Sequence, residues 1–397
     1  MNARGARRLL LVIPMLGGAG AENQLVHLAI GLATRGYDVT LAAVVSVRRD
    51  IEPLRAAGVR VVDLGARSRL GKIAALRRLV RLARDADVVH CGLWDATLWA
   101  RLAAIVARRP VVVAEHSGGR EIHRSRTGAP RGRWIAAHHR ILSPFTFATV
   151  ACATWQMPLL EREGVDPDKI VYLPNGVPID DLRAASHIGS GRAALDLPEH
   201  ALVVVHVARL EYMKNQRASL DAVRRVRAEL GDVRLLLVGD GSEREALERY
   251  ADSIGADWAT FLGRRSDVPA LLALADLAVL PSLVEGMPMS LIEAIALGVP
   301  IVATDVGDVR TTLERTGAGL WVPAGDADAF FEASRSLLVD ADERDAIGRT
   351  AHQSRLFDAG RMVDRYAALF EAAVAGGAPS QALLEQAEEP AATESRH

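Results

Sequence analysis

The sequence contains few cysteines, few lysines and no long apolar run. Cys91 and Cys152 are its only cysteines among 397 residues, too few for a disulfide framework. No run approaches the ~20 apolar residues that a membrane-spanning helix needs. Lysine occurs only at positions 72, 169 and 214. These shortages exclude a disulfide-stapled scaffold and make the few lysines informative.

Positive and negative charges are concentrated in different halves of the chain. Residues 1–150 contain 24 Lys and Arg and 10 Asp and Glu, a net charge of +14. The whole chain contains 48 and 49, so the remainder contains 24 and 39, a net charge of −15. This asymmetry indicates that the N-terminal half faces an anionic partner. The alternative is a compositional preference for arginine without any partner.

Short apolar strands alternate with helical segments along the chain, which is typical of parallel, doubly wound α/β sheets. A length of 397 residues suits two such domains. We expect an N-terminal domain over 1–175, a C-terminal domain over 176–355, a helix over 356–376 and a disordered tail over 377–397. The expected strands are 9–13, 39–45, 59–63, 88–91, 111–114, 149–152, 170–173, 202–207, 234–238, 259–262, 277–280, 300–303 and 319–322.

The N-terminus imitates a signal peptide, because Arg7-Arg8 precede an apolar run that ends near the small residues Ala19-Gly20-Ala21. The same residues suit a buried first strand followed by a glycine turn into a helix that begins near Glu22. We favour the strand, and with it a cytoplasmic protein.

Two glutamates follow the apolar strand Leu277–Leu280. Glu285 lies in the loop after Pro281-Ser282, and Glu293, with seven residues between the two, lies in a helix expected to begin near Met289. Both carboxylates can therefore face the crevice at the carboxyl end of the strand, where ligands bind in open α/β sheets. The helix N-terminus suits a diphosphate. The alternative is an acidic loop followed by an ordinary helix.

Two basic residues occupy another loop between a strand and a helix. Arg209 follows the strand 202–207, and Lys214 comes five residues later. Two cations in such a loop suit a diphosphate leaving group. The alternative is a pair of solvated surface charges.

The stretch from Leu280 to Ala294 resembles the signature of glycosyltransferase family 4, which has the two-lobed GT-B fold: two Rossmann-like domains facing across a cleft. The resemblance implies that Glu285 holds the hydroxyls of the donor sugar beside Ser282, and that Glu293 holds the nucleotide ribose. It also implies that backbone N–H groups of Met287, Met289 and Ser290 meet the diphosphate. Pro288 has no N–H, so one donor is missing there.

Further donor-side residues follow from the same resemblance. Gly18 or Gly20, in the glycine loop after the first strand, would lie against the diphosphate. Gly239 occupies another strand-end glycine turn, and Arg264 lies in the segment whose backbone meets the base. Arg209 and Lys214 match the cations that compensate the diphosphate. The terminal helix 356–376 would cross back onto the N-terminal domain.

On the acceptor side, His116 follows the strand 111–114, where the family has a histidine at the donor sugar. Taken alone, a strand-end histidine is as easily structural. Trp94 and Asp95, after the fourth strand, are acceptor-contact candidates only.

Four Asp-x-Asp strings begin at Asp85, Asp166, Asp326 and Asp340. Such pairs can hold a divalent ion on a diphosphate. The first lies before a strand, away from the ligand-binding edge, and the others suit turns or helix caps. We therefore expect no metal and no cofactor.

The resemblance implies a retaining glycosyltransferase that moves a sugar from a nucleotide-diphosphate sugar to a hydroxyl acceptor in envelope polysaccharide or glycolipid synthesis. The alternatives are a nucleotide-sugar epimerase of the same fold and a non-catalytic sugar-nucleotide-binding protein. No nucleic-acid partner is expected. The basic residues within 67–84 and 120–140 favour peripheral contact of the N-terminal domain with the anionic inner face of a membrane. A lipid-linked acceptor would accompany such contact. The alternative is an ordinary sheet-covering helix whose arginines are solvated.

Overall fold

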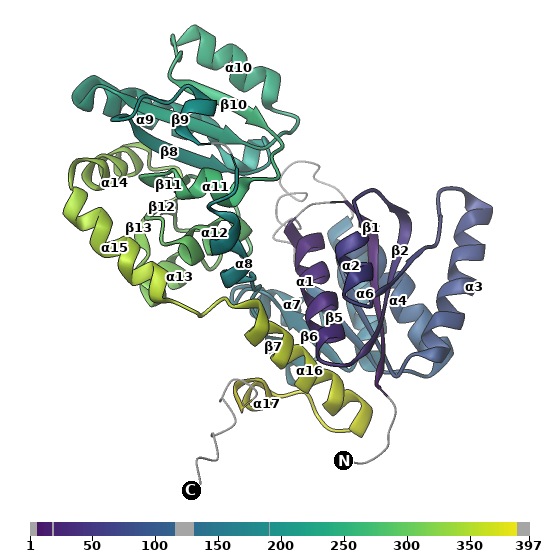
Figure 1. Ribbon diagram of the computed structural model, residues 1–397. Helices are drawn as coiled ribbons and strands as arrows, with labels where there is room; N and C mark the ends of the chain where they lie inside the picture. The colour runs from purple at the N-terminus through teal and green to yellow at the C-terminus, as the bar shows by residue number, and fades with distance from the viewer. Residues whose placement is uncertain (1–5, 18–19, 116–130, 190, 387–397) are drawn as a thin grey trace, which may run out of the picture. The chain divides into compact units, whose positions relative to one another are not determined.

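The computed structural model describes residues 6–17, 20–115, 131–189 and 191–386. The chain forms two compact units, one from residues 1–176 and 359–397 and the other from residues 177–358. Each unit is built on one sheet, with all paired strands parallel (Figure 1). Two doubly wound α/β domains were expected from the alternation of strands and helices, and this prediction is confirmed.

The first unit contains a seven-stranded sheet in the order β3-β2-β1-β4-β5-β6-β7. Its strands are β1 (Arg8–Leu16), β2 (Asp38–Val47), β3 (Arg60–Asp63), β4 (Val88–Gly92), β5 (Val111–Glu115), β6 (Ala148–Ala151) and β7 (Ile170–Tyr172). The order reverses at β1, whose neighbours are β2 and β4. The central strands are apolar on both faces because helices cover both sides.

Helices cover the two faces of this sheet with different sets of residues. The helices of the first unit are α1 (Gly20–Thr34), α2 (Glu52–Ala56), α3 (Arg69–Asp85), α4 (Trp94–Ala107), α6 (Arg131–Leu142), α7 (Gln156–Arg162), α16 (Ala359–Ala375) and α17 (Gln381–Gln386). One core joins the sheet to α1, α2, α16 and α17. A second core, on alternate strand residues, joins it to α3 and α4.

The second unit contains a six-stranded sheet in the order β10-β9-β8-β11-β12-β13. Its strands are β8 (Leu202–Val207), β9 (Val233–Val238), β10 (Ala259–Gly263), β11 (Leu277–Leu280), β12 (Ile301–Thr304) and β13 (Gly319–Val322). Its helices are α8 (Ile179–Ala185), α9 (Gln216–Leu230), α10 (Arg244–Ser253), α11 (Val268–Ala273), α12 (Met289–Leu297), α13 (Val309–Thr316), α14 (Ala327–Val339) and α15 (Ala341–Gln353). Two cores, one on each face, hold these layers together.

The C-terminal part of the chain packs on the first unit. Helix α16 lies beside α1, and Val363 occupies the space above Gly31, where an added Cβ would come within 2.5 Å of it. The expectation of a disordered tail from residue 377 is wrong for its first ten residues. Helix α17 buries Leu384 completely, and Gln381 accepts a hydrogen bond from the N–H of Tyr172. The segment therefore packs on the first unit, although its composition is polar. The rest of the expected tail, 387–397, lies outside the described residues.

Candidate active site

The topology of the second unit places two loops together. Strand β8 pairs with β9 on one side and with β11 on the other, so the direction of winding reverses at β8. Ligands of open α/β sheets bind at such a switch point, outside the carboxyl ends of the strands. The loop after β8 carries Arg209 and Lys214, and the loop after β11 carries Ser282 and Glu285. Four of the sequence-predicted residues thus share one edge of one sheet.

Lys214 and Glu285 form an ion pair across these two loops. The Nζ atom of Lys214 lies 2.5 Å from Oε1 of Glu285, and the hydroxyl of Ser282 donates to the same oxygen at 2.7 Å. Ser282 is fully buried and only 7% of the Glu285 side chain is exposed, whereas 20% of the Lys214 side chain is exposed. A buried charge pair holds its geometry tightly, because breaking it would leave a charge without compensation.

Backbone and amide contacts fix the position of both loops. The amide of Asn215 donates to the carbonyl of Pro281 at 3.2 Å, and the N–H of Leu283 donates to the carbonyl of Met213 at 2.8 Å. Asn215 adopts a left-handed backbone conformation, with φ 50°, immediately before α9. Asparagine tolerates this conformation better than most residues. Hydrogen bonds between the two loops therefore hold Lys214 and Glu285 in position to pair.

Residues of a third loop, after β12, support the same site, and sequence reasoning missed their role. The hydroxyl of Thr304 contacts the carbonyl oxygens of Ser282, at 2.5 Å, and Leu280, at 3.3 Å. Gly307 has φ +60°, and an added Cβ there would lie 2.6 Å from the carbonyl oxygens of Glu285 and Gly286. The sequence does contain this glycine three residues after the end of β12, but only the structure reveals which loop it touches.

Arg209 is placed differently from Lys214. Its side chain is 63% exposed and pairs with Glu211. Its carbonyl accepts from the amide of Gln216 at 2.9 Å, which ties the start of the loop to α9. The structure therefore brings Lys214 to Glu285, and leaves the guanidinium of Arg209 at the solvent-facing side of the same loop.

A neutral histidine lies beneath this loop. His206, on β8, is buried, and its Nδ1 atom lies 2.9 Å from the hydroxyl of Ser219. Burial, with a smaller contribution from the positive charge of Lys214, lowers the pKa of His206 to about 3. Lys214 thus supplies the positive charge here without a second cation at His206.

Helix α12 begins at Met289, as predicted, with Pro288 in the capping position. Proline supplies no capping side chain, so the first turn suits an anion that accepts from backbone N–H groups, including that of Ser290. Met287 is buried, and its sulfur accepts a hydrogen bond from the hydroxyl of Thr312 at 3.9 Å. The side chain of Met287 therefore packs inward, and the backbone at the start of α12 is left to contact a ligand.

Glu293 lies in the second turn of α12. The residue is only partly exposed, its carboxyl group is enclosed by protein, and this burial raises its pKa to about 7. Carboxyl groups at functional sites often have a pKa raised by burial. Hydrogen-bond donors from a ligand then stabilise the ionised form. Sugar or ribose hydroxyls are donors of this kind.

Glycine turns bring two further strand ends close to the site loop. Gly239 has φ +136°, and an added Cβ would lie 2.0 Å from the carbonyl oxygen of Ala208. Its N–H donates to the carbonyl of Gly263 at 2.8 Å. Glycine at 239 is thus required by close backbone packing, and Arg264, next to Gly263, has an exposed side chain.

The predicted residues of the first unit are described only in part. Gly18 and His116 lie outside the described residues. Gly20 is the first residue of α1, and Trp94 and Asp95 open α4, but the side chains of Trp94 and Asp95 also lie outside the described parts. These residues stay predictions.

The Asp-x-Asp strings serve structural purposes, as expected. Asp166, Asp326 and Asp340 each accept a backbone N–H at the start of a helix. Asp87, in the first string, accepts the N–H of Arg8 at 2.9 Å, at the edge where β1 and β4 begin. Within the described ranges, no group of three or more His, Cys, Asp or Glu side chains is arranged to hold a metal ion.

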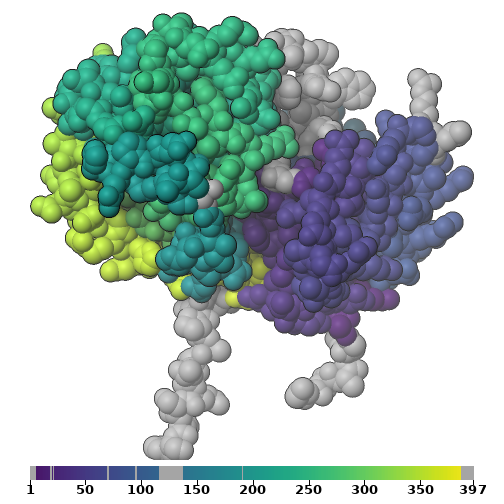
Figure 2. Space-filling model, turned by 45° about the horizontal axis from the view of Figure 1, so that its top comes forward, coloured from purple at the N-terminus to yellow at the C-terminus, as the bar shows by residue number. Residues whose placement is uncertain are grey.

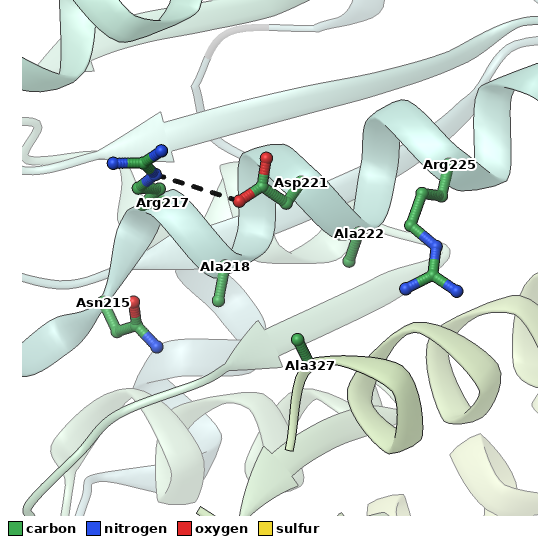
Figure 3. A pocket seen from close by; sticks show the side chains of 7 residues that line it. All are labelled: Asn215, Arg217, Ala218, Asp221, Ala222, Arg225 and Ala327. Carbon is green, nitrogen blue, oxygen red and sulfur yellow. Dashed lines mark ion pairs between the residues drawn. The ribbon is translucent and has the colours of Figure 1, made fainter. Parts of the chain in front are cut away.

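A separate pocket of about 210 Å³ lies along α9 and the start of α14, next to Asn215 (Figure 3). Its charged side chains are already paired: Arg217 lies 4.0 Å from Asp221, and Arg225 lies 2.6 Å from Asp328. Because these charges compensate one another, we assign no ligand to this pocket.

Among the helices of the described residues, none is both long and apolar enough to cross a membrane.

Comparison with known proteins identifies the family. Residues 190–354 match the family described as Glycosyl transferases group 1, and residues 18–181 match Glycosyltransferase Family 4. The chain is 28% identical to a phosphatidyl-myo-inositol mannosyltransferase of Mycobacterium leprae, over 80% of this chain and 83% of the relative. It is also 28% identical to D-inositol 3-phosphate glycosyltransferase 1 of Catenulispora acidiphila, over 80% and 79%.

Among solved structures, HepE of Anabaena in complex with UDP-glucose superimposes with a TM-score of 0.77, at 22% identity, over 91% of this chain and 98% of that one. This likeness shows the fold. Each unit has a parallel sheet whose strand order reverses at one strand, and the two family matches together span most of both units. The chain therefore belongs to glycosyltransferase family 4, has the GT-B fold and acts as a glycosyltransferase.

Proposed function

We propose that the protein transfers a sugar, with retention of anomeric configuration, from a nucleotide-diphosphate sugar to a hydroxyl acceptor used in cell-envelope glycolipid or polysaccharide synthesis. The observation that carries this proposal is the cluster of Lys214, Glu285 and Ser282 at the switch point of the second sheet. One cation and one oriented carboxylate lie there, and the loop that carries Glu285 leads directly into the N-terminal turn of α12.

The donor would bind mainly to the second unit. Glu293 would accept hydrogen bonds from the ribose, and the first turn of α12, with the backbone of Met287, Met289 and Ser290, would meet the diphosphate. Gly239 and the main chain of Arg264 would border the nucleotide. The relation to a structure solved with UDP-glucose supports a donor of this chemical class.

The reaction would break the bond between C1 of the sugar and the phosphate oxygen and form a bond between C1 and the acceptor oxygen. Lys214 and Arg209 would stabilise the negative charge that develops on the departing diphosphate, typically a large catalytic contribution. Glu285, oriented by Ser282 and Lys214, would hold the sugar hydroxyls. The acceptor proton would pass to the leaving phosphate oxygen, so no protein nucleophile is needed.

The first unit would contribute the acceptor side. His116 would support the sugar or the incoming hydroxyl, Gly18 or Gly20 would lie against the diphosphate, and Trp94 and Asp95 would contact the acceptor. Relatives named for phosphatidyl-myo-inositol and inositol phosphate support a hydroxyl acceptor, including one carried by a lipid. We place the protein in the cytoplasm, at the inner face of the membrane.

No metal or other cofactor enters this proposal. Lys214 and Arg209 supply two positive charges on the loop that would face the diphosphate, which is the role a divalent ion fills in other sugar transferases. The negative charge of the donor would therefore be compensated by the chain itself.

The decisive experiment is turnover of a library of nucleotide-sugars, with and without lipid and saccharide hydroxyl acceptors, followed by mass spectrometry. The proposal expects a glycosylated acceptor and a released nucleoside diphosphate, both lost in Glu285→Gln. Conversion of the donor without any acceptor would identify an epimerase. A donor that binds but is not turned over with any of the acceptors would identify a sugar-nucleotide-binding protein.

A further inference from the structure

Helix α4 of the first unit has an inverted arrangement of polar and apolar residues. Arg101, in its middle, is fully buried beneath the helix, and its positive charge acts on the buried thiol of Cys91. Leu98, Leu102 and Val106 instead lie on the outer side, with 44%, 38% and 58% of their surface exposed. Their spacing of four residues puts them on one stripe of the helix.

The core between α4 and the sheet does not include Leu98, Leu102 or Val106. The inner side of α4 packs on the sheet through small residues, namely Ala96, Ala100, Ala103 and Ala104. Thr97 and Arg101, the polar residues that an ordinary surface helix would turn to water, are buried instead. A contiguous exposed apolar stripe on a helix with a buried arginine indicates a surface that is covered when the protein functions.

The neighbouring helix α3 supplies positive charge. It packs side by side with α4, contains six basic residues and a single acid, Asp85 at its last position, and lies on the outside of the first unit (Figure 2). Its exposed basic residues are Lys72, Arg77, Arg78, Arg81 and Arg84. Ile73, on the same helix, is 53% exposed. The helix therefore exposes an apolar residue as well as its basic residues.

We propose that α3 and α4 together form a membrane-docking face in which Leu98, Leu102 and Val106 enter the boundary between headgroups and acyl chains, while the basic residues of α3 bind anionic headgroups. This inference deepens the proposed function, on which it rests for its lipid-linked acceptor. Interfacial helices bind through buried apolar area combined with electrostatic attraction. Here the two contributions come from two adjacent helices.

The charges also distinguish an anionic membrane from a second copy of the chain. A two-fold dimer through this face would bring the same patch of each copy together, so the basic side of one α3 would approach the other. Like charges brought together weaken such an interface. The exposed stripe formed by Leu98, Leu102 and Val106 is aliphatic, which fits acyl chains better than a hydrogen-bonding protein surface.

The test measures binding of the full-length protein to vesicles of phosphatidylcholine with and without phosphatidylglycerol, at low and high salt. We expect Leu98→Gln/Leu102→Gln/Val106→Gln to lower the partition coefficient by about tenfold or more and to lower the part of the binding that survives high salt. Val339→Gln, which alters an apolar residue of similar exposure (55%) on α14 in the other unit, should leave binding unchanged.

A fluorescent probe makes the test independent of the triple variant. The thiols of Cys91 and Cys152 are fully buried and burial raises the pKa of each, to about 12 for Cys91, so an added surface cysteine can be labelled selectively. An environment-sensitive probe at Val106→Cys should shift to the blue with anionic vesicles. A probe at Glu52→Cys, on the opposite side of the sheet, should not.

Three outcomes would overturn the inference. The triple variant could bind vesicles as the wild type does, or the probe at position 106 could stay in water while the protein is bound. Alternatively, ultracentrifugation could show that the triple variant abolishes self-association, which would make this face a dimer interface. Arg77→Gln/Arg78→Gln/Arg81→Gln should also weaken binding to anionic vesicles; if this variant loses binding while the apolar triple variant binds as the wild type does, which is the first of the three outcomes, the contact is electrostatic without insertion. None of these measurements depends on sugar transfer, so a failure of the proposed reaction is recognised separately.

Discussion

Lys214 Nζ lies 2.5 Å from Glu285 Oε1, although 70 residues separate the two positions along the chain. The two residues come from loops that follow neighbouring parallel strands, β8 and β11. The pair fixes the carboxylate proposed to hold the sugar and the cation proposed to face the diphosphate in one rigid unit. Most of the tests below act on this unit.

Removal of the Lys214 charge should lower turnover strongly. We expect Lys214→Met, which keeps most of the side-chain volume, to reduce kcat on the order of a hundredfold, the effect of losing one preorganised charge stabiliser. Arg209→Ala should act in the same direction. Arg217→Ala is the control, because Arg217 lies three residues after Lys214, its side chain is as exposed as that of Arg209 (66% against 63%), and its ion pair with Asp221 is local. Steady-state kinetics with unchanged circular dichroism is the measurement, and wild-type turnover in Lys214→Met would remove this residue from the mechanism.

Nucleotide binding should release a proton from Glu293. Burial raises its pKa to about 7, and hydroxyl donors from the ribose would favour the ionised form and lower that pKa again. Affinity for a nucleoside should therefore rise between about pH 5 and pH 8. Calorimetry in buffers of different ionisation enthalpy measures the proton released, with a nucleoside used so that no phosphate titrates. Glu293→Gln should abolish the release, and an unchanged release in that variant would assign the proton to another group.

The same raised pKa has a consequence for stability. Because the folded pKa of Glu293 exceeds the unfolded value of 4.5, the neutral carboxyl is favoured in the folded protein. Its contribution is fully present below about pH 4.5 and is lost as the pH rises through about 7. Glu293→Gln mimics the neutral form, so its Tm relative to the wild type should increase from pH 5 to pH 8. A difference in Tm that does not vary with pH would contradict the shift.

Gly307 should be needed for the position of Glu285. A Cβ at this position would lie 2.6 Å from the carbonyl oxygens of Glu285 and Gly286. Gly307→Ala should raise KM for the donor several-fold and lower stability, by about 1–2 kcal/mol from the positive φ alone. Gly325→Ala is the control, since Gly325 has φ +83° with nothing within 4 Å. It carries the backbone strain without the contact, so equal KM values in both variants would show that the Gly307 contact does not position the site.

Activity should persist in excess chelator. The reason is that Lys214 and Arg209 place two positive charges on the loop proposed to face the diphosphate, and that Asp166, Asp326 and Asp340 are engaged as helix caps. The measurement is the initial rate before and after treatment with EDTA. Loss of activity that magnesium or manganese restores would refute charge compensation by the chain.

Local sequence patterns predicted the elements of this fold well. Apolar β-branched runs, such as those at β8 and β11, identify buried strands because each strand is covered on both faces. Glycine and proline mark the strand ends. The positions of Lys214 and Glu285 at one sheet edge follow from parallel pairing, and the start of α12 at Met289 follows from the change in periodicity.

Contacts between distant segments were decided only by the tertiary structure. No local pattern reveals that Thr304 supports the carbonyl of Ser282, or that Gly307 must yield space to Glu285. The polar composition after residue 377 concealed α17, because composition does not show that Leu384 reaches the core of the first unit. In α4, the sequence alone gives an apolar helix with one arginine. Which side of that helix faces the sheet was decided by packing, and alanines at the inner positions let the helix approach closely, with Arg101 inside and Leu98, Leu102 and Val106 outside.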